Sequence, residues 1–473
     1  MPTTTIIHCS LPWIVLISIF MFVLPRTSHT FSAPGSFALA ISFPVVLGLY
    51  SVYGIGLHIA SNVAALVACI IFVLTISTIL SDRPDMALKH LIVYSAAAFI
   101  GVAFSGYNTL SIVMYSAIIH SVFICIPWSG RGNGWLGNSN FAGAFLAPCV
   151  FIAWYLNEPL AAGLFVLVLI RTRCKGAMLG LIAGAIFINP IALIVFVLIF
   201  ARFVLTKRQR SSRTMRSRAS MWRTSLKLMT IKRLSFGVGG DVGRILFMRN
   251  RHARYRFRRL HSDIIQGLFD GGIFYVILYL GIGIYSVMTA PPELAAALLS
   301  LMIAGLFVDT QLVYFTSALF WLLVGKISFS AAPAIVMSPW MLPFAIVIFV
   351  LVIQTWGRAF VADTIHGVAF RRGNGKLMAL AHRINPSDDL ATASLVGAMI
   401  LSKQHGPAFD LAWKLVDRYD GSLNAEIPYY LLAVASFNVG AYPIAKAMAQ
   451  QCLVYCDHDG AKKLLEVMGK RGL

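Results

Sequence analysis

The chain has 473 residues, of which 58% are hydrophobic and only 12% are charged. In ordinary soluble globular proteins about a quarter of all residues are charged. The low charge content and the mean hydropathy of +0.79 therefore exclude that class and predict a membrane protein. The formal net charge is +21, which is large for a chain with so few charged residues.

Apolar stretches follow one another along most of the chain, and each is a candidate for a membrane-spanning helix. A helix needs about 20 mostly apolar residues to cross the hydrocarbon core. The candidates lie near residues 6–24, 36–54, 58–80, 90–105, 108–127, 140–156, 159–172, 176–189, 190–205, 264–286, 293–308, 311–326 and 338–356. The sequence therefore predicts an all-α polytopic bundle of 12 or 13 spans over residues 1–356.

Two details of this assignment leave alternatives. The first stretch, which contains LPWIVLISIF, lacks the basic start of a signal peptide and is followed by more spans, so we expect a retained helix. The stretches 176–189 and 190–205 are short and meet at Asn189-Pro190, so they form either a hairpin or one long helix. That choice determines the side of the membrane on which all later segments lie.

The positive charge is concentrated between two predicted spans, in an extramembrane loop of about residues 206–262. From Lys207 to Arg259 there are seventeen Lys or Arg residues and one acid, Asp241, which gives +16 of the net +21. A cytoplasmic loop facing anionic lipid is one interpretation. A site that grips the phosphates of an anionic membrane-borne substrate is another. We expect no nucleic-acid partner, because no recognisable module is present and aromatic residues are too sparse for base stacking.

The seven cysteines show no paired CxxC spacing, which argues against a disulfide scaffold or a zinc site. Most lie in apolar runs, and we expect Cys452 and Cys456 to pack in the core of a soluble helical region.

Four separated stretches carry candidate chemistry. They read GWLGNSNFAG at 134–143, TRCKGA at 172–177, RASMWRTSLKLMTIKRLSFGVGGDVG at 218–243 and HSDIIQGLFDGGIFYVILYL at 261–280. In this order they resemble the O-antigen ligase and polymerase family, and the resemblance covers roughly residues 80–330. The matching residues are Gly134, Gly137, Asn138, Asn140, Gly143, Thr172, Gly176, Ala177, Arg218, Trp222, Gly237, Val238, Gly239, His261, Asp270 and Gly272.

The resemblance implies a multi-pass glycosyltransferase of the bacterial inner membrane, of the kind used in lipopolysaccharide and surface polysaccharide assembly. Such enzymes move a glycan from an undecaprenyl-diphosphate carrier to an acceptor hydroxyl at the periplasmic face, without a nucleotide sugar, and we expect neither a metal nor a cofactor. The family pattern places the asparagine, TRCKGA and histidine stretches on the periplasmic side, which favours the hairpin. It also places the basic loop outside, against a positive-inside rule that is weak for loops near about 60 residues.

His261 is the predicted general base, or the residue that orients the acceptor, because histidine titrates near neutral pH. The alternative is a histidine that only anchors a helix start at the membrane interface. Asp263 and Asp270 are candidates to orient His261.

Cations are needed because a departing diphosphate gains negative charge. Arg218 and Lys175 are the predicted catalytic clamps, although the family has arginine at the position of Lys175 and serine at that of Cys174. Lysine keeps the charge and loses the planar fork. Further predicted donor-binding residues are Arg173, Arg258, Arg259, Asn138 and Asn140. The two asparagines equally suit a structural turn and helix cap.

Residues 357–473 are predicted to form a soluble helical domain. Its segments 405–421 and 439–456 are offset by about 34 residues and resemble tetratricopeptide repeats, which commonly bind a protein partner. The sequence does not identify the acceptor, which is a lipid A core sugar, a growing glycan or a protein. The non-enzymatic alternative is a transporter or a lipid-binding scaffold, and the scarcity of acids within the spans disfavours the transporter.

Overall fold

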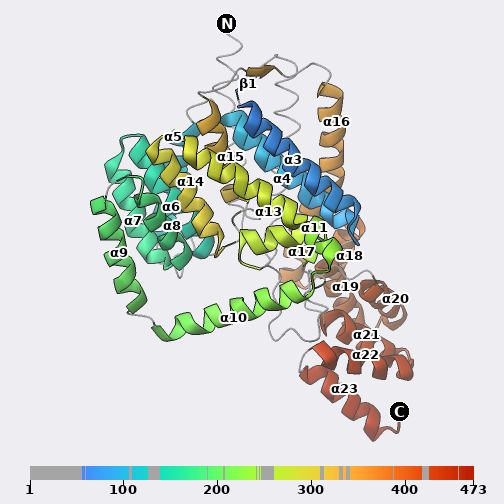
Figure 1. The fold of residues 1–473 in the computed structure, drawn as a ribbon. Helices are drawn as coiled ribbons and strands as arrows, with labels where there is room; N and C mark the ends of the chain where they lie inside the picture. Colours follow the sequence, from blue (N-terminus) through green and yellow to red (C-terminus); the bar gives the residue numbers. More distant parts are fainter. Residues whose placement is uncertain are drawn as a thin grey trace. The chain divides into compact units, whose positions relative to one another are not determined.

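A computed structural model describes the chain at residues 56–58, 60–105, 109–125, 139–188, 190–205, 208–240, 242–243, 246, 260–308, 310, 314–329, 334–336, 341–386, 388–417, 426–455 and 458–473 (Figure 1). Within these ranges the chain is helical apart from one pair of three-residue strands. Strand β1 (Gly56–His58) pairs antiparallel with β2 (Ala334–Val336), with Gly56 opposite Val336. The predicted all-α class is confirmed.

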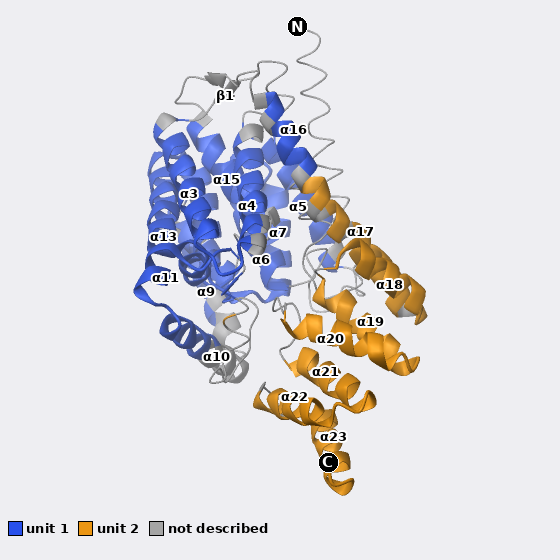
Figure 2. Cartoon of the chain, turned by 90° about the vertical axis from the view of Figure 1, so that its right-hand side faces the viewer, with its two compact units in different colours: residues 1–24, 38–243, 259–351 blue, residues 25–37, 244–258, 352–473 orange. Residues whose placement is uncertain are grey.

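The chain folds into two compact units (Figure 2). Unit 1 comprises residues 1–24, 38–243 and 259–351, and unit 2 comprises residues 25–37, 244–258 and 352–473. Every described residue of the candidate site belongs to unit 1.

The helices of unit 1 follow the apolar stretches of the sequence. They are α3 (Ser61–Ile79), α4 (Pro84–Phe104), α5 (Thr109–Cys125), α6 (Ser139–Tyr155), α7 (Pro159–Thr172), α8 (Lys175–Ala185), α9 (Pro190–Leu205), α10 (Arg208–Lys227), α11 (Ile231–Phe236), α13 (Asp263–Thr289), α14 (Pro292–Gly305), α15 (Tyr314–Phe329) and α16 (Met341–Val352). Each predicted span from residue 58 onward overlaps one of these helices. The predicted spans 6–24 and 36–54 lie outside the described residues.

Two of these helices are long and apolar enough to cross a membrane by length and composition. They are α3, over Asn62–Ile79, and α13, over Asp263–Thr289. The apolar parts of α4, α5, α6, α7, α8, α14 and α15 have 10–17 residues each. By this measure, two of the described helices support the expectation of 12 or 13 spans.

The α8–α9 region is broken by a turn. Helix α8 ends at Ala185, and the amides of Phe187 and Ile188 donate to the carbonyls of Gly184 and Ala185 before α9 begins at Pro190. A proline is tolerated at the first position of a helix, where its missing N–H is not needed. The structure thus has two helices here, and the alternative of one long helix is wrong.

Small residues bring α8 close to its neighbours. Gly176, Gly180 and Gly184 lie four residues apart on one helix face that packs against α14. A Cβ atom at Gly180 would overlap the carbonyl oxygen of Ser300, and one at Gly184 would lie 2.6 Å from the carbonyl oxygen of Ala296. Glycine at these positions allows the backbones to approach, as in the small-residue interfaces of membrane helices.

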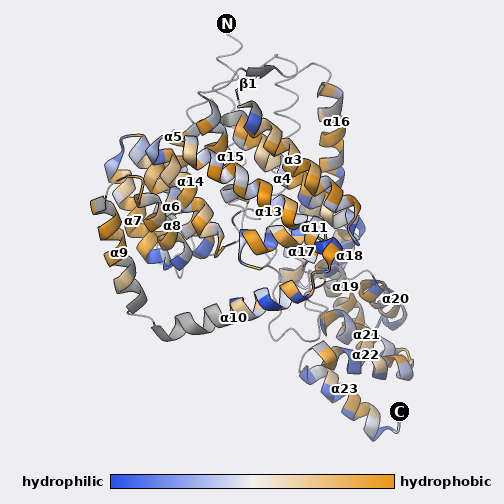
Figure 3. Cartoon of the chain, in the orientation of Figure 1, coloured by the Kyte–Doolittle hydropathy of each residue, from blue (hydrophilic) through white to orange (hydrophobic). Residues whose placement is uncertain are grey.

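Hydrophobic residues make up much of the helices of unit 1 (Figure 3). They form its buried core and are also found among its exposed residues. The largest fully buried side chains include Trp321, Phe145, Phe165 and Phe320. The exposed side chains of α9 are mainly aliphatic: Ile191, Ile194, Val195, Val197 and Leu198. An exposed apolar face of this extent suits contact with lipid or a partner better than contact with water.

The strongly basic segment is more regular than a loop. It contains the 20-residue helix α10 and the short helix α11. The first turn of α11 is capped by Thr230, whose hydroxyl accepts a hydrogen bond from the Arg233 amide at 3.4 Å. The predicted extramembrane connection is therefore largely helical over the residues that the structure describes.

The third segment of unit 2, residues 352–473, begins with the short π-helical turn η3 (Ile353–Gly357). Its helices are α17 (Arg358–Arg372), α18 (Gly375–Ile384), α19 (Asp389–Leu401), α20 (His405–Asp417), α21 (Glu426–Asn438), α22 (Tyr442–Tyr455) and α23 (Asp459–Lys470). Each helix from α17 onward packs against the next along the chain.

Small buried side chains allow this stacking of helices in unit 2. They occupy equivalent positions of α20 and α22: Ala408, Ala412 and Leu415 in the first, and Ala445, Ala449 and Cys452 in the second. The predicted packing role of Cys452 is confirmed, whereas Cys456 lies outside the described residues.

Candidate functional site

The asparagine and TRCKGA stretches meet where α6 begins. The Cys174 thiol donates to the backbone carbonyl of Asn140 over 3.6 Å. Gly143 lies so close to this loop that a Cβ atom would be 2.5 Å from the Cβ of Cys174. The structure thus brings together two motifs that are about a whole helix pair apart in sequence. Asn138 lies outside the described residues.

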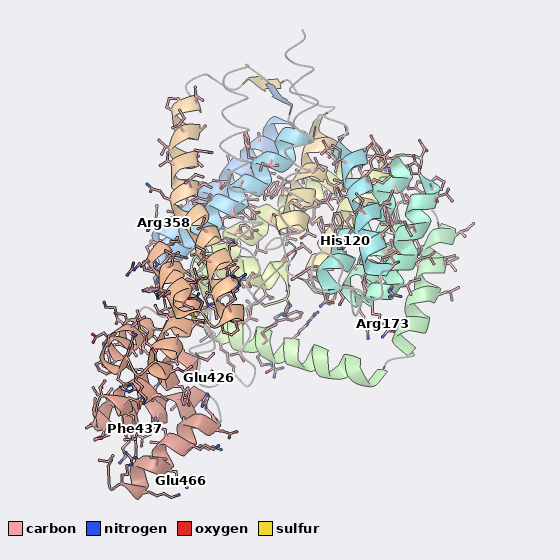
Figure 4. All side chains as sticks on the ribbon, turned by 180° about the vertical axis from the view of Figure 1, so that it is seen from behind. His120, Arg173, Arg358, Glu426, Phe437 and Glu466 are labelled. Carbon is pink, nitrogen blue, oxygen red and sulfur yellow. The ribbon has the colours of Figure 1, made fainter. Side chains whose placement is uncertain are left out.

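The α7–α8 loop is held by its own side chains. The Cys174 amide donates to the Thr172 hydroxyl at 3.3 Å, and the Cys174 sulfur caps α8 by accepting from the Ala177 amide at 3.5 Å. Arg173 has a left-handed backbone with φ of 56° and an exposed side chain, and Lys175 is half-buried. Figure 4 shows Arg173 at the edge of the helical unit, pointing away from the interior.

Helix α10 is close to this loop. Burial raises the pKa of the Cys174 thiol to about 11, and the positive charge of Arg218 acts against that increase. A charge has such an effect only over a short distance. The charge of Arg218 therefore reaches the TRCKGA loop, and its role as a clamp stays a prediction.

Helix α10 also holds the histidine loop. The Trp222 indole Nε1 donates to the carbonyl oxygen of Leu260, the residue before His261, at 2.7 Å. Arg218 and Trp222 are four residues apart, so they lie on the same helix face one turn apart. One face of α10 thus connects the loop that carries Lys175 with the loop that carries His261.

His261 is half-buried and has a left-handed backbone with φ of 52°. This conformation costs a non-glycine residue about 1–3 kcal/mol and persists only where the surroundings impose it. The Leu260 amide donates to the Gln266 Oε1 atom at 3.2 Å, and the Gln266 amide donates to the Ser262 carbonyl at 2.8 Å. The loop is therefore tied to the first turn of α13.

Two buried carboxylates follow His261 on α13. Asp263 accepts a hydrogen bond from the Thr310 hydroxyl. Asp270 accepts two from Gln266 Nε2, at 3.0 and 3.1 Å, and its Oδ2 lies 3.9 Å from His90 Nε2 of α4. These contacts tie Asp263 to the segment after α14 and Asp270 to α4. Orientation of His261 by either carboxylate stays a prediction.

The glycine-rich stretch has a structural part in this arrangement. Gly237 and Gly239 have φ of 75° and 96°, and a Cβ atom at Gly237 would lie 2.6 Å from the Asp270 carbonyl. The Val238 amide donates to the Phe269 carbonyl at 2.7 Å. Ser81 Oγ donates to the Val238 carbonyl at 2.7 Å. Glycine is needed here because the segment runs directly along the backbone of α13.

The first helical segment of α13 ends at Gly272. Its φ of 77° breaks the helix, and the Ser235 carbonyl occupies the space that a Cβ atom would need. Ser77 Oγ donates to the carbonyl of Asp270 at 2.5 Å, which satisfies one acceptor freed by the break. The segment from Asp263 to Gly271 is therefore a separate short helix that carries both carboxylates.

The other predicted cations are not all part of this arrangement. Arg258 and Arg259 lie outside the described residues. Arg233 Nη2 lies 3.6 Å from the exposed Asp82 carboxylate on the α3–α4 connection, a surface pair of little energetic weight. Among the described residues, no three His, Cys, Asp or Glu side chains are arranged to hold a metal ion.

Sequence reasoning missed Gln266, His90 and Thr310. Gln266 was recognisable, since it lies four residues before Asp270 and therefore on the same face of a helix. His90 and Thr310 come from distant segments, and no local pattern pairs them with Asp270 and Asp263.

Comparison of the chain with protein-family models and with curated protein sequences finds no match. The site is therefore interpreted from its own residues. It combines a basic side chain near a capped loop, a half-buried histidine in a constrained backbone, and buried carboxylates that fix the helix after the histidine.

Proposed function

We propose that the chain is a polytopic inner-membrane glycosyltransferase of the O-antigen ligase-like class. The observation that carries the proposal is the position of α10. Through Arg218 and Trp222 it lies next to both the TRCKGA loop and the histidine loop, which are far apart in sequence and were predicted to form one site. Figure 1 shows α10 running across one end of the helices of unit 1.

The membrane part of the proposal is supported by composition and packing. The apolar stretches, the exposed aliphatic face of α9 and the glycine contacts between α8 and α14 are all expected of a multi-pass bundle. The α8–α9 turn leaves an even number of spans between the TRCKGA stretch and the basic segment. On this topology both lie on the same side of the membrane, which we propose to be the periplasmic side.

The proposed reaction is displacement at an anomeric carbon. The acceptor hydroxyl oxygen forms a bond to that carbon, and its proton passes to a ring nitrogen of His261. The bond from the carbon to the diphosphate oxygen breaks, and the polyprenyl diphosphate leaves with both electrons of that bond. Arg218 and Lys175, with Arg173 at the surface, offset the charge that develops on the leaving group.

Unit 2 supports a second element of the proposal. Its consecutive packed helices with buried alanines are the arrangement expected of degenerate tetratricopeptide repeats. We propose that this unit binds a protein partner or helps to present the acceptor. The acceptor is a lipid A core sugar for a ligase, another lipid-linked repeat for a polymerase, or a protein hydroxyl for an O-oligosaccharyltransferase.

The test is the surface-glycan profile of source cells that lack the gene and are complemented with wild type or His261→Ala. We expect His261→Ala to reach the membrane at the wild-type level and to behave as the deletion. Lys403→Ala is a matched control, because Lys403 also has a left-handed backbone but lies in unit 2.

The pattern of loss identifies the acceptor. Absence of all long glycan with polymer accumulating on the carrier lipid indicates a ligase, and cores bearing a single repeat indicate a polymerase. Loss of glycosylated proteins with normal lipopolysaccharide indicates a protein O-oligosaccharyltransferase. Normal glycans of every kind in the deletion strain would reject the proposal and favour a lipid-binding scaffold.

A further inference from the structure

The peptide groups around Leu260 are held from two sides by side chains. Trp222 of α10 donates to the Leu260 carbonyl at 2.7 Å, and the Leu260 amide donates to Gln266 of α13 at 3.2 Å. Leu260 itself is buried. Because both polar groups of this backbone residue have partners, the chain is fixed immediately before it enters His261.

The Gln266 side chain is in turn fixed in one orientation. Its Nε2 donates to both carboxylate oxygens of Asp270, at 3.0 and 3.1 Å, and both residues are buried. The backbone N–H of Leu260 can only donate, so the oxygen of Gln266 must face Leu260 and its nitrogen must face Asp270. His90, with Nε2 at 3.9 Å from Asp270, extends this chain of contacts to α4.

The orientation matters because His261 adopts a backbone that it would not choose by itself. A left-handed conformation is unfavourable for a side chain other than glycine, and the neighbouring contacts must impose it. Gln266 is the contact that joins the residue before His261 to the helix after it. No family residue suggested it, since the resemblance matches His261, Asp270 and Gly272 in this stretch.

We propose that Gln266 is a positioning residue that holds the His261 loop, with Asp270 setting the direction of its amide. The part of this inference that concerns catalysis rests on the proposed function. A glutamine that only fills space would tolerate an apolar side chain of similar size, whereas a positioning glutamine would not.

The first measurement is independent of any activity. In purified Gln266→Leu protein the Leu260 amide loses its acceptor, and we expect its hydrogen exchange to become about tenfold faster or more. Ser77→Ala is the matched control, because it removes a buried hydrogen bond to the Asp270 carbonyl without touching the loop. Unchanged exchange at Leu260 in Gln266→Leu would overturn the inference.

The second measurement is the rate of polyprenyl-diphosphate release from a lipid-linked oligosaccharide, with the acceptor that the glycan profile identifies. We expect Gln266→Leu to lower kcat about 10- to 100-fold with little change in KM, since a loosened histidine loop affects the reaction more than binding. Faster exchange with an unchanged kcat would overturn the positioning role in catalysis.

A compensating pair of substitutions separates positioning from folding. Gln266→Glu alone places a second carboxylate beside Asp270, and we expect kcat to fall. Adding Asp270→Asn exchanges the amide and the carboxylate, so the new carboxylate at 266 still accepts from Leu260 and receives a bond from the new amide at 270. We expect most of the kcat to return, and a double variant no better than Gln266→Glu would contradict the proposal. If wild type shows no transfer, the proposed function fails, and the exchange of Leu260 alone decides whether Gln266 holds the loop.

Discussion

Two of the four non-glycine residues with positive φ in the described part of the chain, Arg173 and His261, are candidate site residues. The other two, Asn157 and Lys403, lie in turns between helices. Backbone conformations of this kind cost free energy and are often found at functional sites. Each of the two site residues directly follows a residue that is held by named hydrogen bonds, Thr172 or Leu260, which explains how the conformations are maintained.

The strain at His261 leads to a prediction about stability. Glycine accepts a φ of 52° without the steric cost that alanine pays. We expect His261→Gly to be more stable than His261→Ala by about 1 kcal/mol, while both variants lack glycan transfer. Thermal unfolding of the purified proteins in detergent measures the difference. A glycine variant that is less stable than the alanine variant would show that the loop is not strained at this residue.

The Cys174 thiol supplies a second prediction. Its sulfur caps α8, and serine caps at least as well, so we expect Cys174→Ser to keep wild-type stability at pH 7. Cys174→Ala removes the cap and is expected to lose about 1 kcal/mol of unfolding free energy. Chemical denaturation of the three proteins in one detergent compares them, and equal stability of the alanine variant would show that the cap contributes nothing.

The same thiol predicts a pH dependence. Burial raises its pKa from 9.0 to about 11, so the folded state prefers the protonated form. The resulting stability is complete below pH 9 and is lost as the pH rises to 11. Relative to Cys174→Ser, wild type should therefore lose about 2 kcal/mol over this range. Other titrating groups are common to both proteins and cancel in the comparison. A constant difference between pH 8 and 11 would contradict the burial of the thiol.

At the scale of helices, the close α8–α14 contact leaves no room for a larger side chain at Gly180. Gly180→Ala places a methyl group against the Ser300 carbonyl, and we expect a loss of about 1–3 kcal/mol. Gly163→Ala on α7 is the control, because no atom lies within 4 Å of its added Cβ, and alanine favours helices. Unfolding midpoints in detergent test the pair. Equal effects of the two substitutions would show that α8 and α14 do not pack closely.

The position of most helices was predictable because apolar runs of helical length determine them. A turn before Pro190 was visible as an alternative, and the end of α8 at Ala185 decided it. The break at Gly272 was not predicted, since Asp270-Gly271-Gly272 lies inside one continuous apolar run, and the break depends on the Ser235 carbonyl from a distant segment. For the same reason the partners of Asp263 and Asp270 became visible only in the fold. That Arg218 and His261 belong to one site was expected from the order of the motifs.

At the scale of the whole molecule, the proposed function depends on sidedness. We expect an alkaline phosphatase reporter joined after Lys227 to be active, because the basic segment faces the periplasm in the proposed topology. A reporter joined after Asn157, between α6 and α7, is the control and should be inactive, since one span separates it from the asparagine stretch. The reverse pattern would place the basic segment in the cytoplasm, as the positive-inside rule alone would favour.

The break in α13 has a consequence for the depth at which the proposed reaction would take place. Beyond Gly272 only residues 273–289 continue the helix, and at about 1.5 Å per residue they extend roughly 25 Å, less than a hydrocarbon core of about 30 Å. In the proposed topology the short helix before the break then lies just inside the membrane surface rather than above it. If the proposed function holds, a polyprenyl donor would keep its tail among the lipids while its diphosphate, at headgroup level, would reach Arg218 without leaving the bilayer.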